Sequence, residues 1–190
     1  MPSSPSAVVI SASAVTVVDE SGANLLTHGY LDLTAEVVAD FTALLGTPNE
    51  TPFAQTSHSG AGIEYDWDGL AVLSQDRWAE LDIYDLPEFT PRWFVKVTAP
   101  AARGVEVRTV DGISVGDPTA EVEARFPDAA ERFGSDYVTP RVDFFLASEE
   151  PSDGQGREAA DGMLWRVWLI DEEPEDVIQD IRAPSPNYGA

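Results

Sequence analysis

The clearest periodic pattern in the chain lies in residues 34–45, where apolar side chains recur at helical spacing. The positions that share one face are Val37, Phe41, Leu44 and Leu45. Asp32 or Thr34 can cap the start of this helix, because a side-chain oxygen there accepts a hydrogen bond from a free backbone N–H. Gly46 suits a left-handed cap at the end, and Pro48 blocks continuation. The pattern therefore predicts one amphipathic helix over 34–45.

Short runs of β-branched and aromatic residues predict strands in the rest of the chain. The expected strands are residues 8–10, 14–18, 24–30, 63–67, 70–73, 92–98, 105–110, 141–147, 162–170 and 177–183. The first three strands form a hairpin with its turn at Asp19-Glu20-Ser21-Gly22, from which residues 24–30 return. Asp68-Gly69 predicts a second hairpin, because both positions of a two-residue turn need a positive φ. Residues 49–61, 74–92 and 148–161 are expected to be loops.

A second, shorter helix is expected after Asp117. This aspartate is a good N-cap, and Pro118 suits the first helical position. Val122 and Phe126 share a face, and Pro127 ends the helix. Residues 128–133 are expected to add no more than a turn.

The two predicted helices share a tetrapeptide, since Thr-Ala-Glu-Val at 34–37 recurs at 119–122. The segments that close the two halves also align: Pro100, Val107 and Arg108 match Pro174, Ile181 and Arg182, each 74 residues further on. A helix with one apolar stripe needs a sheet to cover. We therefore predict a β-rich α+β fold of two helix-over-antiparallel-sheet repeats, with separate or continuous sheets. The expected boundaries are a disordered linker at 1–6, a first repeat with an N-terminal hairpin at 7–110, a second repeat at 111–184 and a tail at 185–190.

The second half carries the run Asp-Gly-Ile-Ser-Val-Gly-Asp-Pro-Thr-Ala-Glu-Val-Glu-Ala-Arg-Phe-Pro at 111–127 and ends in Val-Ile-Gln-Asp-Ile-Arg-Ala at 177–183. This resembles one repeat of the helix-over-sheet fold of β-lactamase inhibitory protein and of the small lipoproteins of outer-membrane assembly. The resemblance implies a fold and no activity. Those inhibitors carry disulfides and this chain has no cysteine, so no inhibitory residue is carried over. The whole chain, including its last nine residues, also resembles uncharacterised secreted proteins or lipoproteins of high-GC Gram-positive bacteria, which implies export.

Charge and composition exclude several classes of function. Among 190 residues, 11 are basic and 34 acidic, for a net charge of -23, which disfavours nucleic acids and anionic membranes and permits cationic partners or metal ions. The absence of cysteine excludes cysteine-based zinc sites. No apolar run reaches the length of a membrane helix. The opening stretch, Met-Pro-Ser-Ser-Pro-Ser, has linker composition, so we expect an extracellular or surface-tethered protein whose export signal lies elsewhere; the alternative is a cytoplasmic protein.

Aromatic residues supply the candidate binding surface. By strand parity, Phe145 and Trp168 lie on the face opposite to the one that helices would cover, and with Phe94 they predict an aromatic platform. The acidic and aromatic segment 76–93 offers further contact area. The candidate binding residues are Trp78, Tyr84, Trp93, Phe94, Phe145 and Trp168. The alternative is that these rings fill the gap between the two halves.

Two carboxylate clusters suggest other chemistry. Asp66 and Asp68 flank Trp67 beside Glu64, and paired carboxylates next to aromatics are typical of glycosidases, although Asp68 is better explained as the hairpin turn residue. The candidate metal ligands are Asp171, Glu172, Glu173, Glu175 and Asp176. Oxygen ligands of this kind suit calcium, but the run lacks the spacing of an EF-hand loop, so a solvated turn is the alternative.

No nucleophile motif or phosphate-binding loop is recognisable around either His28 or His58. The sequence therefore favours an exported, non-enzymatic binding domain with no required cofactor, whose partner is an unknown protein or surface ligand. It is compatible with a monomer. A polysaccharide hydrolase that depends on carboxylates and a calcium-stabilised surface domain are the alternatives.

Overall fold

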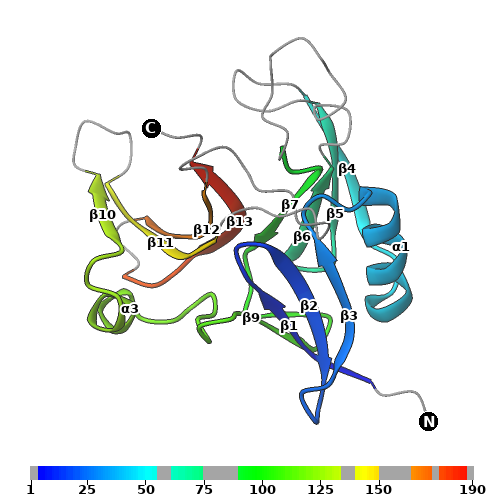
Figure 1. The fold of residues 1–190 in the computed structure, drawn as a ribbon, viewed down its shortest axis with the longest axis horizontal. Coiled ribbons are helices and arrows are strands. Elements are labelled where there is room, and N and C mark those ends of the chain that lie inside the picture. Colours follow the sequence, from blue (N-terminus) through cyan, green and yellow to red (C-terminus); the bar gives the residue numbers. More distant parts are fainter. Residues whose placement is uncertain are drawn as a thin grey trace.

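The structure, a computed structural model, describes residues 4–54, 61–74, 90–133, 140–149, 164–172 and 176–187. Within these residues the chain forms two β-sheets and two helices, α1 (Thr34–Leu45) and α3 (Thr119–Arg125) (Figure 1). The predicted β-rich α+β class is confirmed at this level.

The larger sheet has eight strands. They are β4 (Asn49–Phe53), β5 (Gly62–Asp66), β6 (Leu70–Ser74), β7 (Trp93–Val97), β10 (Ala130–Phe133), β11 (Arg141–Glu149), β12 (Leu164–Glu172) and β13 (Asp180–Asn187). Their order is β10-β11-β12-β13-β7-β6-β5-β4, with antiparallel neighbours throughout. The strands that follow α1 in the chain thus occupy one half of the sheet and those that follow α3 the other, and β7 meets β13 in the middle.

The smaller sheet has the order β3-β2-β1-β9-β8. Its strands are β1 (Pro5–Ile10), β2 (Ala14–Asp19), β3 (Asn24–Gly29), β8 (Ala101–Ala102) and β9 (Val105–Thr109). The predicted N-terminal hairpin is confirmed, and β9 adds to it in parallel with β1. The predicted match between Val107 and Ile181 is wrong, because Val107 pairs with Val8 in the small sheet whereas Ile181 pairs with Val97 in the large one.

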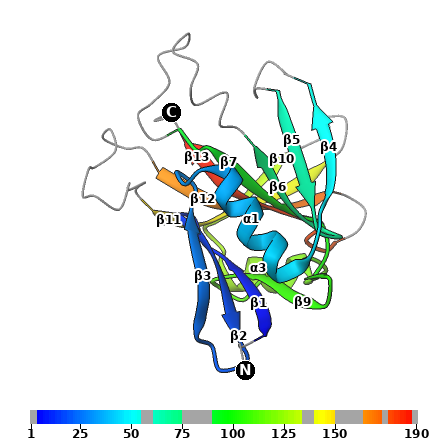
Figure 2. The same cartoon turned by 90° about the vertical axis from the view of Figure 1, so that its right-hand side faces the viewer.

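One face of the large sheet, called here the inner face, carries the core. Tyr30, which follows β3, packs its ring 4.7 Å from Trp93 of β7 and 5.9 Å from Trp165 of β12. Phe41 of α1 lies 5.7 Å from the ring of Trp67, beside β5. All five of these side chains are almost fully buried. The helix therefore covers one end of the inner face and the small sheet its centre (Figure 2).

The helix bounds 34–45 agree with the prediction, but the predicted caps are wrong. Leu33 is the N-cap of α1 and Pro118 that of α3, and neither helix has a side-chain cap. Asp32 and Asp117 instead accept hydrogen bonds from the backbone of the turns before each helix. The end of α1 is as expected, since Gly46 has a φ of 86°.

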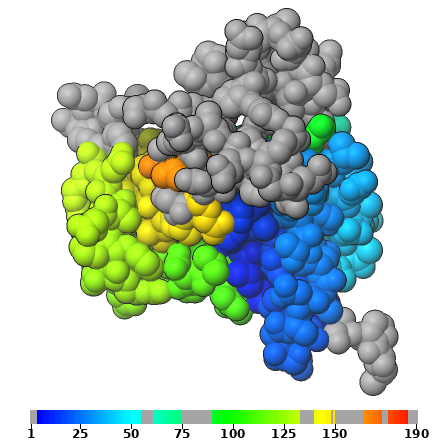
Figure 3. Space-filling view, viewed as in Figure 1, coloured from blue at the N-terminus to red at the C-terminus, as the bar shows by residue number. Residues whose placement is uncertain are grey.

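Both edges of the large sheet lie where no strand was expected. Residues 49–53, predicted as a loop, form β4, and residues 130–133 form β10. The four residues from Asn49 to Pro52 are exposed, so this edge strand lacks the alternating apolar pattern that marks a half-buried strand. Figure 3 shows α3 and β10 at one end of the molecule and α1 at the other. Strands also take in Pro5 and residues up to Asn187, which the prediction placed in the linker and the tail.

Candidate functional site

The outer face of the large sheet carries a row of side chains in register. Six adjacent strands, from β11 to β5, each contribute one residue, and each residue is paired with the one on the next strand. The row is Phe145, Trp168, Arg182, Lys96, Ala71 and Asp66. Their neighbours along each strand, such as Val167 and Ile181, point to the inner face and are fully buried. Because α1 and the small sheet pack on the inner side, this row lies on the opposite surface of the described structure.

Two aromatic rings and three arginines form a compact cluster on this face, called here the arginine–aromatic stack. Phe145 and Trp168 stack with centroids 6.0 Å apart and an interplanar angle of 18°. The guanidinium of Arg166 lies 4.3 Å from the centre of the Phe145 ring. Those of Arg141 and Arg182 lie 5.6 and 5.2 Å from the centre of the Trp168 ring. Distances below about 6 Å are typical of attractive cation–π contacts, so the rings hold the guanidinium groups in place.

Two of the three arginines have a carboxylate partner. Arg141 Nη2 lies 3.2 Å from Asp143 Oδ2, and Arg182 donates to Asp180 Oδ2 from Nε at 3.0 Å and from Nη2 at 2.6 Å. Arg166 has no carboxylate partner in the part of the chain that the structure describes. Its Nε–H is buried without a hydrogen-bond acceptor. Arg166 is thus the one arginine of the stack whose charge is uncompensated there.

Asp143 lies in an unusual environment for a carboxylate. Its side chain is 1% exposed, and its Oδ1 has no hydrogen-bond donor. Burial raises the pKa of Asp143 above its usual value, and the positive charge of Arg141 offsets only part of this effect. The ion pair therefore sits in a poorly solvated part of the outer face.

Two β-bulges flank Arg166. In β11, the register with β12 shifts between Leu146 and Glu149, where Ala147 has a φ of 49°. In the pairing of β12 with β13, it shifts between Arg166 and Trp168. Bulges bend a strand and re-aim its side chains, and they occur often near binding sites. Here the irregular pairings involve both strands next to β12, β11 and β13, close to Arg166.

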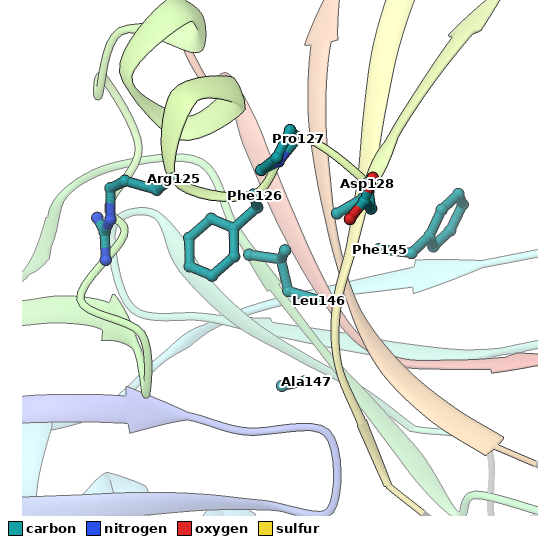
Figure 4. A pocket seen from close by; sticks show the side chains of 8 residues that line it. Arg125, Phe126, Pro127, Asp128, Phe145, Leu146 and Ala147 are labelled. Carbon is teal, nitrogen blue, oxygen red and sulfur yellow. The ribbon is translucent and has the colours of Figure 1, made fainter.

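An open hollow lies between the end of α3 and β11 (Figure 4). Its volume is about 410 Å³, and its lining residues are Arg125, Phe126, Pro127, Asp128, Ala129, Phe145, Leu146 and Ala147. It lies where the chain before β10 separates from β11, just beyond the hydrogen bond from Phe145 N to Ala129 O. Phe145 and Leu146 point to opposite faces of β11, and Leu146 belongs to the core, so the hollow is not part of the arginine–aromatic stack.

The structure brings together only some of the predicted binding residues. Phe145 and Trp168 stack as described. Phe94 lies on the outer face opposite Leu73, outside the stack. Trp93 is 0% exposed and donates its indole N–H to Gly29 O at 3.1 Å, so it belongs to the core. Trp78 and Tyr84 lie outside the described residues.

The carboxylates that suggested a glycosidase have structural roles in a turn. Asp66 Oδ1 accepts a hydrogen bond from Gly69 N at 2.9 Å, and Asp68 has a φ of 60° and pairs with Arg103 at 3.2 Å. Glu64 faces Leu73 across the sheet. The Asp68-Gly69 hairpin turn is as predicted.

The acidic run after β12 is not gathered around one point in the described residues. Asp171 is 4% exposed and accepts a hydrogen bond from Thr119 Oγ1 at 2.7 Å, so it supports the start of α3. Glu172 and Asp176 are exposed, and Glu173 and Glu175 lie outside the described residues. No group of three or more histidine or acidic side chains in the described ranges is arranged to hold a metal ion.

The sequence interpretation missed the basic half of the site. Arg166 precedes Trp168 by two positions in β12, and Arg141 precedes Phe145 by four in β11, so strand parity places them on the faces of the aromatics. The signal was available in this parity. The net charge of -23 favours cationic partners and gives no sign of a local basic patch.

Neither described helix is long and apolar enough to span a membrane. The chain matches no protein-family model. No curated protein and no solved structure shows significant similarity to it. Its class is therefore stated from the fold: a β-rich α+β protein with an eight-stranded antiparallel sheet.

Proposed function

We propose that this protein is an exported, non-enzymatic binding domain whose contact surface is the outer face of the large sheet. The observation that carries the proposal is the arginine–aromatic stack. Tryptophan and arginine are the residues most enriched among those that dominate binding energy at protein interfaces. Four such side chains and Phe145, already ordered against one another, lose little conformational freedom on binding. The export component rests on the resemblance to secreted proteins alone.

The charge distribution supports the same surface. Four of the 11 basic residues of the chain lie on the outer face of four adjacent strands: Arg141 of β11, Arg166 of β12, Arg182 of β13 and Lys96 of β7. The rest of the molecule is strongly acidic. A small basic and aromatic patch in an acidic surround favours one partner orientation over others, because like charges elsewhere oppose misplaced contacts.

A selection of binding peptides tests this function. A displayed library of random twelve-residue peptides is selected against the wild-type protein, and the recovered binders are measured against Phe145→Ala and Arg108→Ala. Arg108 lies in the small sheet and pairs with Glu106, so it is a matched control away from the outer face. We expect most binders to lose at least about tenfold in affinity with Phe145→Ala and none with Arg108→Ala. Recovery of no binders, or of binders indifferent to both changes, counts against the proposal.

We further propose that α1 with β4–β7 and α3 with β10–β13 are tandem repeats. Each unit is one helix followed by four antiparallel strands, and the two units meet where Lys96 faces Arg182. The residues before the helices have nearly the same backbone angles, with φ −66° and ψ 127° at Leu33 and φ −61° and ψ 127° at Pro118. This correspondence is independent of the wrong match of Val107 with Ile181.

A further inference from the structure

On the basis of the proposed binding function, we infer that the site recognises a carboxylate side chain of a partner protein and that Arg166 binds it. The stack contains three arginines of similar setting. Asp143 neutralises Arg141 and Asp180 neutralises Arg182. Arg166 has no such group in the described part of a chain that has 34 acidic residues. A carboxylate from the partner completes the third pair.

The geometry of Arg166 suits this ligand. The Cζ atom of its guanidinium lies 4.3 Å from the centre of the Phe145 ring, and this cation–π contact holds the group in place. Two parallel N–H donors of a guanidinium match the two oxygens of a carboxylate. The Nε–H is buried and lacks an acceptor within the described residues, so a carboxylate that approaches from outside is bound through the Nη atoms.

Other ligand classes fit less well. A sugar ring binds by stacking on an exposed aromatic face, but guanidinium groups already lie over the rings of Phe145 and Trp168. A polyphosphate or nucleic acid carries many closely spaced charges and is repelled by the net charge of -23 more strongly than a segment with one or two carboxylates.

Lys96 extends the site toward the centre of the sheet. It faces Arg182 in register and forms no ion pair within the described ranges. The ammonium group of Lys96 can therefore pair with a second acidic side chain of the same partner segment. An acidic segment of a protein therefore fits the surface better than an isolated small acid.

The first test uses small-molecule probes on the intact protein. The arginine Nε–H signals are followed by NMR in ¹⁵N-labelled protein during titration with glutarate, with its neutral diamide and with inorganic phosphate. The salt concentration is physiological, because screening over about 8 Å then limits the long-range repulsion. We expect glutarate to shift the Arg166 signal in a saturable way and the diamide to leave it in place. The Arg108 signal serves as the internal control. No shift with glutarate, or a shift with phosphate at lower concentration, overturns the inference.

The second test uses the peptides selected on the wild-type protein. In synthetic copies, each Glu is changed to Gln, and affinities are measured with the wild type, Arg166→Ala, Arg166→Lys and Arg108→Ala. We expect the Glu→Gln change to lower affinity about tenfold with the wild type and with Arg108→Ala, but to have little effect with Arg166→Ala. Arg166→Lys should recover only part of the loss, because lysine cannot form the bidentate pair.

The outcomes separate the two proposals. Peptides that need Phe145 but neither acidic residues nor Arg166 leave the binding function standing and overturn the carboxylate inference. Peptides that are indifferent to Phe145 overturn both. Circular dichroism and a melting curve for each variant show whether a lost affinity reflects lost folding.

Discussion

Asp32 and Asp117 make the same two hydrogen bonds in the turns that lead into α1 and α3. Asp32 Oδ2 accepts from Gly29 N at 3.0 Å, and its own N–H donates to Gly29 O at 3.0 Å. Asp117 Oδ2 accepts from Ser114 N at 2.9 Å, and its N–H donates to Ser114 O at 3.2 Å. Each aspartate thus closes a turn two residues before its helix begins.

Substitution of either aspartate should therefore weaken its turn, although Asp32→Ala also removes the contact of Asp32 Oδ2 with His28 Nδ1 at 3.2 Å. Asp32→Ala and Asp117→Ala each remove one side-chain acceptor from a backbone N–H, and we expect each to lower the free energy of unfolding by about 1 kcal/mol. Asp→Asn at either position keeps an acceptor oxygen and is the matched control. Urea unfolding measures the four variants. A loss at one position and none at the other would speak against equivalent roles and weaken the repeat proposal.

The second prediction concerns the tight turn between β5 and β6. Gly69 has a φ of 110°, and a Cβ added to it would lie 2.5 Å from the Cβ of Ala99. Gly69→Ala therefore adds a steric clash to backbone strain, and we expect a loss of stability above about 2 kcal/mol. Gly22→Ala is the control: its φ is 81°, but nothing lies within 4 Å of the added carbon, so about 1 kcal/mol is expected. Equal losses in thermal unfolding would refute the role of the Ala99 contact.

Local patterns in the sequence predicted much of the fold. The bounds of α1 follow from the apolar spacing of Val37 and Phe41, and the hairpin at Asp68-Gly69 follows from turn chemistry. The edge strands β4 and β10 were missed because an exposed edge needs no apolar alternation. The sequence also did not predict which strands pair. No residue near Val107 indicates that its strand pairs with Val8 in the small sheet rather than joining the large one.

For the candidate site, parity predicted the shared face of Phe145 and Trp168. It did not predict that they stack, because stacking also requires the right register between β11 and β12. That register depends on the connection between the strands and on bulges within them. The assignment of Asp171 to a metal cluster rested on neighbours in sequence. In a strand, successive side chains point to opposite faces, and this separates Asp171 from Glu172.

The third prediction follows from the buried contact of Asp171. Asp171→Ala leaves the Thr119 hydroxyl without its acceptor, and we expect a loss of about 1–3 kcal/mol in the free energy of unfolding. Thr119→Val should lose less in the Asp171→Ala background than in the wild type, because the same bond cannot be removed twice. Since Asp171 faces the core, excess calcium should not raise the melting temperature. A clear rise on calcium addition would revive the metal hypothesis.

The fourth prediction is a pH dependence that arises at Asp143. Its pKa is raised in the folded protein by burial, so the folded state holds this proton more tightly than the unfolded chain does. As pH rises above the pKa of an unfolded aspartate, about 3.9, ionisation of Asp143 therefore lowers stability. Asp143→Asn removes this contribution. Relative to the wild type, the variant should become more stable between pH 4 and pH 7.

Urea unfolding of both proteins across this pH range measures the difference. The Asp180→Asn variant is a useful comparison, since Asp180 pairs with Arg182 on the same face through two hydrogen bonds to Oδ2. If the stability of Asp143→Asn relative to the wild type falls as pH rises, the pair with Arg141 outweighs burial. That result would also mean that Arg141 binds the Asp143 carboxylate strongly enough to overcome the cost of burying its charge.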